Sequence, residues 1–281
     1  MNRTMITATN TLSQMQKQID TISQNIANVD TTGYKKRDAT FSDLLFQQVN
    51  NQRHQSKEVN RFTPNGIRQG TGAKLSQTQL IFSQAAIKNT DRSLDTAFTK
   101  QGQMYRVLVQ QGENSQIQYT RDGAFSLSLI SENEALLVTS KGYPILDENN
   151  QPITINARSA KEYTISSNGR LTVVLDNNTE QNFNLGVTYV KRPQFLEQKG
   201  ENLYSLPENM PEINVTTADI FTELNGPLRN EISIEQKSLE QSNVDLSKEL
   251  TDLISTERAY QFQTRSVTLA DQMMGLVNGI R

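Results

Sequence analysis

Few side chains in this chain of 281 residues are suited to covalent or metal chemistry. It contains no cysteine, and His54 is its single histidine. Thiol nucleophiles, thiolate metal sites and multi-histidine metal centres are therefore excluded. A histidine-based triad would depend on one residue in a polar segment rich in Asn and Gln, so we do not assign one. The lack of cysteine also removes disulfides and leaves the redox compartment undetermined.

Two other patterns have the residue types of a chemical site but the wrong setting. Asp147 and Glu148 are adjacent beside Asn residues, in an expected loop where solvated carboxylates are the rule. The segment GIRQGTGAK, residues 66–74, contains Gly-x-Gly, but Lys74 is misplaced for a phosphate loop and the segment is better explained as a turn. We predict that the chain is not an enzyme and has no catalytic, cofactor-binding or metal-binding residues.

The composition restricts the classes of partner. The hydrophobic fraction of 35% is below the roughly 45–50% of globular chains, so part of the chain is not expected to bury itself alone. A formal net charge of -2 argues against nucleic acid and anionic membrane surfaces. No run approaches the roughly 20 apolar residues of a membrane span, and the N-terminus lacks the apolar stretch of a secretory signal. We expect no nucleic-acid binding, no membrane insertion, and any export to proceed without a cleaved signal peptide.

The N-terminal segment carries an apolar residue at alternating steps of three and four. This 3.5-residue repeat predicts a coiled-coil seam on a helix within residues 1–32. Threonines and serines between the seam positions are mediocre helix formers, so we expect the helix to be weak alone. A surface helix lying on its own domain is the alternative. The predicted seam residues are Met5, Ala8, Leu12, Met15, Ile19, Ile22, Ile26 and Val29.

Residues 240–281 repeat this design at the other end. A helix from Leu246 to the C-terminus would span about 54 Å, too long for one small core to cover. We therefore expect the two terminal helices to form a coiled-coil assembly domain, pairing with each other and with other copies of the chain. Residues spaced seven apart form two neighbouring rows along this helix. The apolar row consists of Leu246, Leu253, Tyr260, Val267 and Met274, and the mostly polar row consists of Leu250, Glu257, Thr264 and Asp271.

Between the helices the hydrophobic period changes to that of strands. Short β-prone runs separated by turn signals such as Asn168-Gly169 predict a β-rich outer domain at residues 76–239. Residues 33–75 are expected to form an extended connector. The fold class is therefore α+β, with a central antiparallel β domain. The β-prone runs are residues 105–111, 116–120, 124–130, 135–140, 153–155, 163–167, 170–176 and 183–190.

Two motifs at opposite ends of the chain resemble the signatures of the bacterial flagellar rod and hook axial protein family. The first is SQNIANVDTTGYKK, residues 23–36, and the second is LEQSNVDLSKELTDLISTERAYQ, residues 239–261. YTRDGAF, SKGYPI and GENLYS are similar to pieces of the family's β domain, and residues 63–84 are most similar to the connector of the distal rod proteins. The motif residues we single out are Asn25, Asn28, Thr31, Gly33, Tyr34, Lys35, Asn243, Arg258, Ala259 and Tyr260.

The resemblance implies a structural subunit of the flagellar basal body in the cell envelope. Both terminal helices would pack in the inner wall of a hollow helical tube, the distal rod. The implied partners are other copies of the chain, neighbouring rod and hook subunits, and the flagellar export apparatus. The predicted assembly interface consists of Met5, Leu12, Met15, Ile19, Ile22, Ile26, Val29, Leu246, Leu250, Leu253, Tyr260, Val267 and Met274.

Other assignments remain open from the sequence. Within the family, the chain could be a proximal rod or hook-like subunit. Outside it, the alternatives are a peptidoglycan-cleaving enzyme, for which no credible acid and nucleophile pair is present, and a secreted β protein such as an adhesin. At the end of the first motif, Gly33 would free the backbone to turn, and Asn25 and Asn28 would bond to backbone or to a neighbouring helix.

Overall fold

The computed structural model describes residues 2–43, 46–49, 67–70, 73–111, 114–156, 158–200, 202–207 and 215–279. His54 lies outside the described residues, as does much of the predicted connector. The chain divides into two compact units. The helical unit comprises residues 1–26, 37–79 and 246–281, and the β unit comprises residues 27–36 and 80–245. Residues 33–75, which the sequence placed in a connector, are thus shared between the two units.

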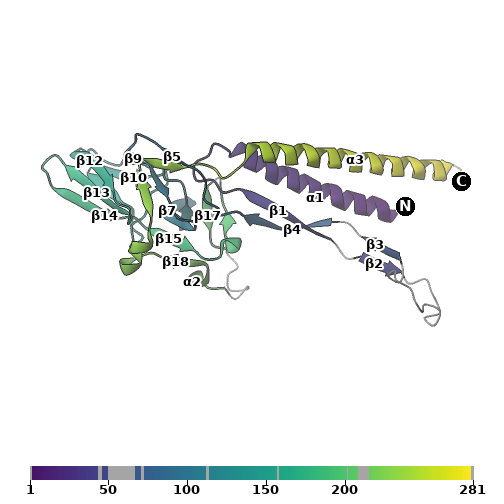
Figure 1. Ribbon diagram of the computed structural model, residues 1–281, viewed down its shortest axis with the longest axis horizontal. Helices are drawn as coiled ribbons and strands as arrows, with labels where there is room; N and C mark the ends of the chain where they lie inside the picture. The colour runs from purple at the N-terminus through teal and green to yellow at the C-terminus, as the bar shows by residue number, and fades with distance from the viewer. Residues whose placement is uncertain are drawn as a thin grey trace. The chain divides into compact units, whose positions relative to one another are not determined.

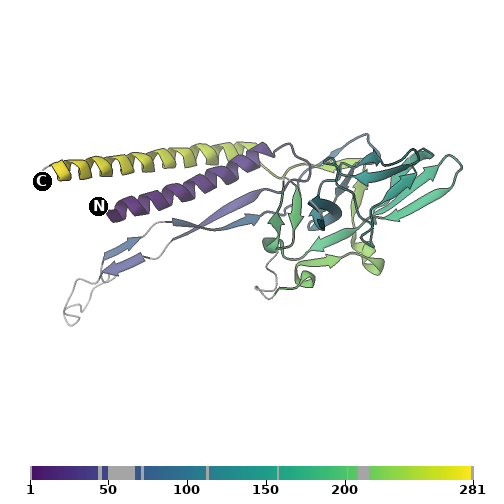
Figure 2. The same ribbon diagram turned by 180° about the vertical axis from the view of Figure 1, so that it is seen from behind.

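Two long helices make up most of the helical unit. Helix α1 spans Asn2–Ala27 and helix α3 spans Leu246–Gly279. They lie side by side in both views, and the two chain ends are at the same end of the pair (Figures 1 and 2). Nδ2 of Asn25 donates a hydrogen bond of 3.1 Å to Oε2 of Glu249, which joins the last turn of α1 to the first turn of α3. The two helices are therefore antiparallel neighbours joined where Asn25 meets Glu249, and their pairing along a coiled-coil seam stays a prediction.

The α1 residues predicted to form the seam are shielded from solvent. Ala8 and Ile22 are buried, and the remaining helical seam residues are half-buried. The prediction was wrong for Val29, which lies beyond the last helical residue, Ala27. The helix ends here because the chain enters a turn in which the backbone N–H of Thr31 bonds to the carbonyl of Asn28.

Helix α3 also has residues shielded from solvent at a 3.5-residue repeat. They form two rows along the helix, and one of these rows differs from the predicted one. Leu246 and Leu250 are exposed by 43% and 42%. The bond from Asn25 explains the shift, because it brings Glu249 rather than Leu250 to the α1-facing side. The shielded residues are Leu253, Tyr260, Val267 and Met274 in the predicted row, and Glu249, Thr256, Gln263 and Ala270 in the other.

The described part of the connector is extended, and its strands pair with one another. Strand β1 pairs with β4, and β2 pairs with β3 in antiparallel register from Phe46 opposite Gly70 to Val49 opposite Ile67. Their bounds are β1 Arg37–Asp43, β2 Phe46–Val49, β3 Ile67–Gly70 and β4 Ala73–Leu80.

The β unit is built from antiparallel sheets, as predicted. The largest has six strands in the order β16-β17-β8-β7-β15-β18, and two three-stranded sheets have the orders β11-β10-β9 and β12-β13-β14. Strands β19 and β6 form one pair, and β20 and β5 another. Each of the predicted β-prone runs contains a strand. The strands are β5 Ile87–Asn89, β6 Thr96–Phe98, β7 Gln103–Gln111, β8 Asn114–Thr120, β9 Ser126–Leu129, β10 Glu134–Val138, β11 Thr154–Asn156, β12 Ala160–Ile165, β13 Arg170–Leu175, β14 Glu180–Asn184, β15 Val187–Val190, β16 Glu197–Gln198, β17 Leu203–Ser205, β18 Phe221–Glu223, β19 Ile234–Gln236 and β20 Ser238–Glu240.

Aromatic rings anchor the core of the β unit. Phe98 and Phe125 pack on either side of Tyr105, with ring centroids 4.3 Å and 4.9 Å from that of Tyr105, and all three are fully buried. A second cluster contains Tyr119 on Phe221, at 4.2 Å. Short helices complete the unit: η2 Pro193–Phe195, α2 Thr217–Ile220 and η3 Gly226–Glu231. Across the described part of the chain, neither long helix is apolar enough to span a bilayer.

Candidate functional site

The two terminal motifs meet in both units, and the contact in the helical unit centres on Asn25. Its side chain is buried. Nδ2 donates to the carbonyl of Arg37 at 2.8 Å, and Oδ1 accepts from the backbone N–H of Arg37 at 3.0 Å. Together with the bond to Glu249, these contacts satisfy the amide on both sides. One side chain thus fixes the end of α1, the start of β1 and the first turn of α3, as the sequence predicted for an asparagine bonded to backbone and to a neighbouring helix.

In the β unit, Gly33 makes the turn that follows α1. It adopts a φ of 69°, in the left-handed region, and its N–H donates to the carbonyl of Glu240 at 2.8 Å. A Cβ here would lie 2.6 Å from the backbone carbon and oxygen of Arg121. Both the backbone angle and the close approach therefore require glycine. The predicted role of Gly33 in the turn is confirmed, and the crowding against Arg121 adds a reason that the sequence did not show.

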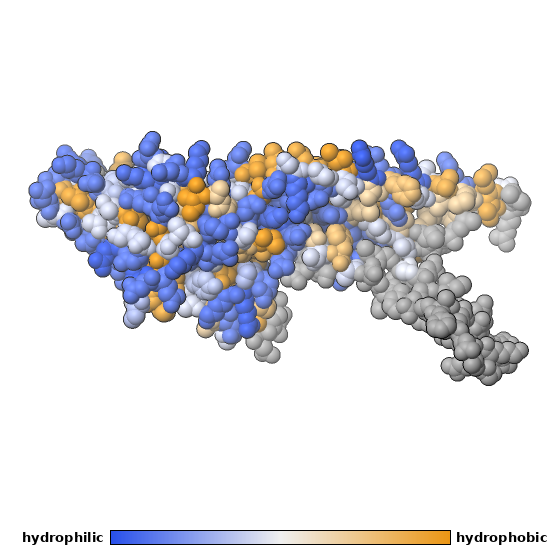
Figure 3. Space-filling model, viewed as in Figure 1, coloured by the Kyte–Doolittle hydropathy of each residue, from blue (hydrophilic) through white to orange (hydrophobic). Residues whose placement is uncertain are grey.

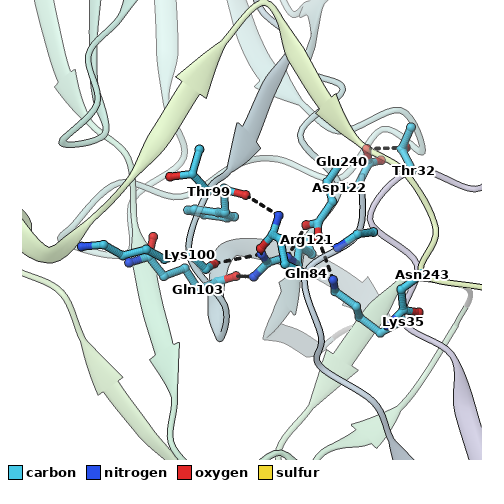
Figure 4. A network of polar contacts seen from close by, with 12 residues as sticks. Thr32, Lys35, Gln84, Thr99, Lys100, Gln103, Arg121, Asp122, Glu240 and Asn243 are labelled. Carbon is cyan, nitrogen blue, oxygen red and sulfur yellow. Dashed lines mark hydrogen bonds and ion pairs between the residues drawn. The ribbon is translucent and has the colours of Figure 1, made fainter. Parts of the chain in front are cut away.

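A buried ion cluster holds the two motifs together in the β unit (Figure 4). Nζ of Lys35 lies 2.7 Å from Oε1 of Glu240, and Nε of Arg121 donates to Oε2. All three side chains are almost fully buried. Oε1 of Glu240 also accepts from the backbone N–H of Ala85 at 2.9 Å. One carboxylate therefore binds two cations, which leaves a net positive charge in the interior.

Carbonyl and amide oxygens accept further hydrogen bonds from the two cations. Nη1 of Arg121 donates to the carbonyl of Gln103 at 2.8 Å, and Nη2 donates to Oε1 of Gln84 at 2.6 Å. The guanidinium also lies 5.5 Å from the centroid of the Phe98 ring. Nζ of Lys35 donates to the carbonyl of Ser83 at 2.8 Å. A buried charge is tolerated only when its hydrogen bonds are made, and this cluster meets that condition.

The side chain of Asn243 connects the first motif to the segment after β4 by hydrogen bonds to their backbone groups. Its Oδ1 accepts from the N–H of Lys36 at 2.7 Å, and its Nδ2 donates to the carbonyl of Ile81 at 2.7 Å. Its own N–H donates to the carbonyl of Tyr34. The second motif thus bridges the first motif and the segment that follows β4.

The other predicted motif residues have simpler settings. Oδ1 of Asn28 accepts from the hydroxyl of Thr31 at 3.1 Å, and Tyr34 is buried. On α3, Arg258 is exposed, whereas Ala259 and Tyr260 are half-buried. Sequence reasoning did not select Arg121 or Gln84, and it included Glu240 in the second motif as part of the family signature, without a role of its own. Arg121 lies within YTRDGAF and Glu240 within the second motif, but neither pattern indicates a buried ion pair.

The adjacent carboxylates of Asp147 and Glu148 have structural partners. Oδ1 of Asp147 accepts two backbone bonds at 2.8 Å within its own turn, and Glu148 lies 3.5 Å from Arg229. No group of three or more His, Cys, Asp or Glu side chains in the described residues is placed to hold a metal ion. The arrangement at the two motifs can join chain segments, and we see no pairing in it suited to bond making or breaking.

Burial gives Lys35 an unusual pKa. Desolvation lowers it, and the positive charge of Arg121 lowers it further. Glu240 offsets part of this effect by its charge and its hydrogen bond, and the resulting pKa is about 8 rather than 10.5. Between these two values the unfolded chain binds more protons than the folded chain, so the free energy of unfolding rises with pH in this window.

We expect replacement of Lys35 by Met to remove this pH dependence. Between about pH 8.0 and about pH 9.5, the free energy of unfolding of the unsubstituted protein should rise by on the order of 1 kcal/mol relative to that of Lys35→Met. Urea unfolding at both pH values measures the difference. The range stops below pH 10 because burial raises the pKa of Tyr119 to about 12, which makes stability fall above the pKa of an unfolded tyrosine. Equal pH dependence in the two proteins would show that Lys35 is not protonated differently on folding.

Gly33→Ala should destabilise the β unit by more than about 2 kcal/mol, because the new Cβ combines a strained φ with a backbone clash. Gly142→Ala is the matched control, since Gly142 has a φ of 86° but no atom within 4 Å of the added Cβ. That control should cost about 1 kcal/mol. Urea unfolding of the three proteins gives the comparison, and equal losses for the two variants would contradict the crowding at Gly33.

Comparison with known families covers both ends of the chain and its middle. Residues 5–35 match the family described as flagella basal body rod protein. Residues 235–280 match the C-terminal family of the flagellar basal body rod FlgEFG proteins, and residues 101–173 match the flagellar hook protein FlgE/F/G D1 domain. The two terminal matches contain Asn25, Gly33, Lys35, Glu240 and Asn243, the residues that connect the motifs.

Curated relatives match over their full length. The chain is 46% identical to the flagellar hook-basal body complex protein FlhP of Bacillus subtilis (strain 168), over 100% of both chains. It is 32% identical to the flagellar basal-body rod protein FlgG of Borreliella burgdorferi, over 100% of this chain and 99% of that one. Identity to FlgG of Bacillus subtilis (strain 168) is 28%, over 98% and 97%. This chain therefore belongs to the family of flagellar basal-body rod and hook-basal body proteins.

Proposed function

We propose that the chain is a structural subunit of the flagellar basal body that assembles helically into the distal rod. Its family consists of structural proteins of the flagellar axis, and the FlgG relatives are basal-body rod proteins. Other copies of the chain and neighbouring rod and hook subunits are its partners. We further propose that it has no catalytic activity and that the flagellar export apparatus carries it out of the cell.

The observation that carries this proposal is that α3 is apolar on two sides. One side faces α1 through the shielded rows. By helical geometry, a second set of apolar residues projects from the opposite side, where it is exposed; Phe262 is 71% exposed. Hydrophobic residues are visible along the surface of α3 in Figure 3. This outer face consists of Ile254, Phe262, Leu269, Met273 and Leu276.

An exposed apolar row on a long helix is typical of a surface that becomes buried on association. Contact between the outer face of one copy and a helix of the next would be heterologous, because two different surfaces meet. Such contacts continue into open helical filaments when the rotation between copies does not close. The helical unit therefore suits a tube wall in which the α1-facing rows hold a subunit together and the outer face joins it to other subunits. Within that wall we propose a coiled-coil arrangement that contains the predicted interface residues other than Val29.

The printed name of FlhP supports a second candidate, a subunit elsewhere in the hook-basal body complex. The chain is more similar to FlhP than to FlgG of the same bacterium. Under this alternative the chain would be a proximal rod or hook-like subunit, with the same mode of assembly but another axial position. Peptidoglycan cleavage and adhesion have no support in the described residues.

Deletion of the gene separates these positions along the axis. We expect short rods without hooks to accumulate in isolated basal bodies, because a distal rod subunit is required before the hook can be built. Electron microscopy of the basal bodies measures rod length, and re-expression of the gene is the control. Complete rods that lack hooks would favour the hook-side alternative, and unchanged flagella would contradict both.

The helix faces predict a graded response to charged substitutions. Ile22→Asp and Leu253→Asp should abolish rod assembly, since each places a carboxylate between α1 and α3. Phe262→Asp should lower incorporation roughly tenfold or more while leaving the helix pair intact, because it removes apolar area from the outer face alone. Gln261→Glu is the matched control, since it adds a negative charge beside Phe262 without loss of apolar area.

Complementation of the deletion strain, followed by rod counts and swimming assays, measures these effects. Urea unfolding of each purified variant reports whether the β unit is intact, and we expect it to be unchanged. Normal rods with Ile22→Asp or Leu253→Asp would contradict the assignment of the seam. Normal rods with Phe262→Asp would contradict the outer face as an assembly surface.

A further inference from the structure

We propose that β units of successive copies are joined by a tip-and-cleft contact that involves the β9–β10 hairpin. The tip comprises residues 129–134, from the last residue of β9 to the first residue of β10. The cleft lies at the other end of β10. In this contact the tip of one copy occupies the cleft of a second copy. The inference rests on the proposed function, because it requires that copies of the chain assemble.

The tip exposes two large apolar side chains. Leu129 is 72% exposed and Ile130 is 59% exposed, and every other residue of the tip is also exposed. Backbone bonds hold this conformation: the N–H groups of Ile130 and Ser131 both donate to the carbonyl of Glu134, at 2.9 Å and 3.2 Å. Exposure of two adjacent aliphatic side chains on an ordered turn is unfavourable in water. Their burial against another protein surface would lower the free energy.

The cleft is lined by both polar and apolar groups and has a volume of about 290 Å³. Its floor is ordered by Asp122, whose two carboxylate oxygens accept from the hydroxyls of Thr32, at 3.0 Å, and Ser140, at 2.6 Å. Leu203 and Tyr143 supply apolar wall, and Lys141 supplies positive charge, whereas Lys199 forms an ion pair with Glu197 at 3.2 Å. This volume is at the lower limit of small-molecule sites, and it suits one or two inserted side chains better than a large ligand.

One polar atom at the cleft lacks a partner. Nδ2 of Asn202 donates to the carbonyl of Thr32 at 2.5 Å, whereas its Oδ1 is buried and accepts no hydrogen bond from the described residues. A buried acceptor without a donor costs free energy, so an inserted N–H or O–H group would be favoured there. The backbone and hydroxyl donors of a turn such as the tip meet this requirement.

The tip is acidic, and an exposed lysine at the cleft has the opposite charge. The tip carries Glu132 and Glu134, which are both exposed, and Lys141 lies beside the cleft. Electrostatic complementarity of this kind fixes the register of a contact and disfavours wrong partners. It selects the tip of a second copy over a basic or purely apolar occupant.

The positions of the tip and the cleft require two copies. Strand β10 has 5 residues and joins the tip to the cleft residues Thr139, Ser140 and Lys141. At about 3.3 Å per residue, the strand separates the two features by roughly 17 Å. A hairpin that carries a projection at one end and its receptor at the other cannot fill its own cleft. It forms a head-to-tail contact between copies, which is the kind that propagates along a filament.

Site-directed disulfide formation tests this contact in intact basal bodies. The chain has no cysteine, so introduced thiols are the only ones it offers. Cells that lack the native gene would express two tagged full-length variants together, Ile130→Cys and Lys141→Cys. After mild oxidation, we expect a disulfide-linked heterodimer in isolated basal bodies, and a ladder of higher multimers from a chain that carries both substitutions.

Asn177→Cys paired with Lys141→Cys is the matched control, because Asn177 is also exposed, at the β13–β14 turn of the same unit. Its yield should be at least tenfold lower. Complete rods with no tip-to-cleft disulfide, or with a yield no higher than the control, would overturn the contact and leave the proposed function intact. Linkage of Ile130→Cys to a different rod protein would overturn the choice of a second copy. Absence of the chain from basal bodies would instead contradict the proposed function.

A charge reversal gives an independent readout. Lys141→Glu should lower rod assembly at least tenfold by placing a carboxylate near those of the tip, and Glu132→Lys in the same chain should restore it. Lys141→Arg should assemble as the parent does. Unchanged assembly with Lys141→Glu, or failure of Glu132→Lys to restore it, would contradict the pairing of the tip with the cleft.

Discussion

The buried carboxylate of Glu240 makes the contacts that hold the two terminal motifs to the core of the β unit. It binds Lys35 from the first motif and Arg121 from the core strands, and it accepts the N–H of Ala85. A buried carboxylate must be compensated, and two cations with further hydrogen bonds do so here. These three partners come from three separate segments of the chain. Loss of the carboxylate would remove the anion that both buried cations contact. Covalent order alone could not bring residues 35, 121 and 240 together.

Asn25 has the corresponding role in the helical unit. A neutral amide pairs with both backbone groups of Arg37 and with Glu249, so it can orient two helices and a strand without burying an unmatched charge. The same bond sets the rotation of α3, and this rotation decides which rows of α3 are shielded. The outer face is a consequence of that rotation, because the apolar residues left on the far side have no partner within the described chain.

A subunit of a filament needs interfaces that differ from one another, since identical patches would close into a dimer. The chain offers such differences in each unit. In the helical unit, the shielded rows and the outer face of α3 are distinct surfaces. In the β unit, the tip and the cleft occupy opposite ends of one hairpin. Under the proposed assembly, the contacts that hold the subunit together would be separate from those that join it to other copies.

Much of the fold follows from local pattern in the sequence. The 3.5-residue repeat located α1 and α3, period-two runs located the strands of the β unit, and the two motifs indicated the family. These signals are local, since each depends on residues within one or two turns or one hairpin. The end of α1 and the second shielded row of α3 could not be predicted from the repeat. Val29 and Leu250 both fit the repeat, but whether such a position is helical and shielded depends on the neighbours that the helix meets.

The tertiary structure decided what the motif residues do. Arg121, Glu240 and Lys35 are ordinary charged residues in the sequence, and each would be expected on the surface. Their burial together, the crowding of Gly33 by the backbone of Arg121, and the cleft beside Asn202 arise from contacts between distant segments. Lys35 and Arg121 are 205 and 119 residues from Glu240 in the sequence. Local propensity determines which elements form, whereas desolvation and charge pairing act only after the chain has brought distant segments together.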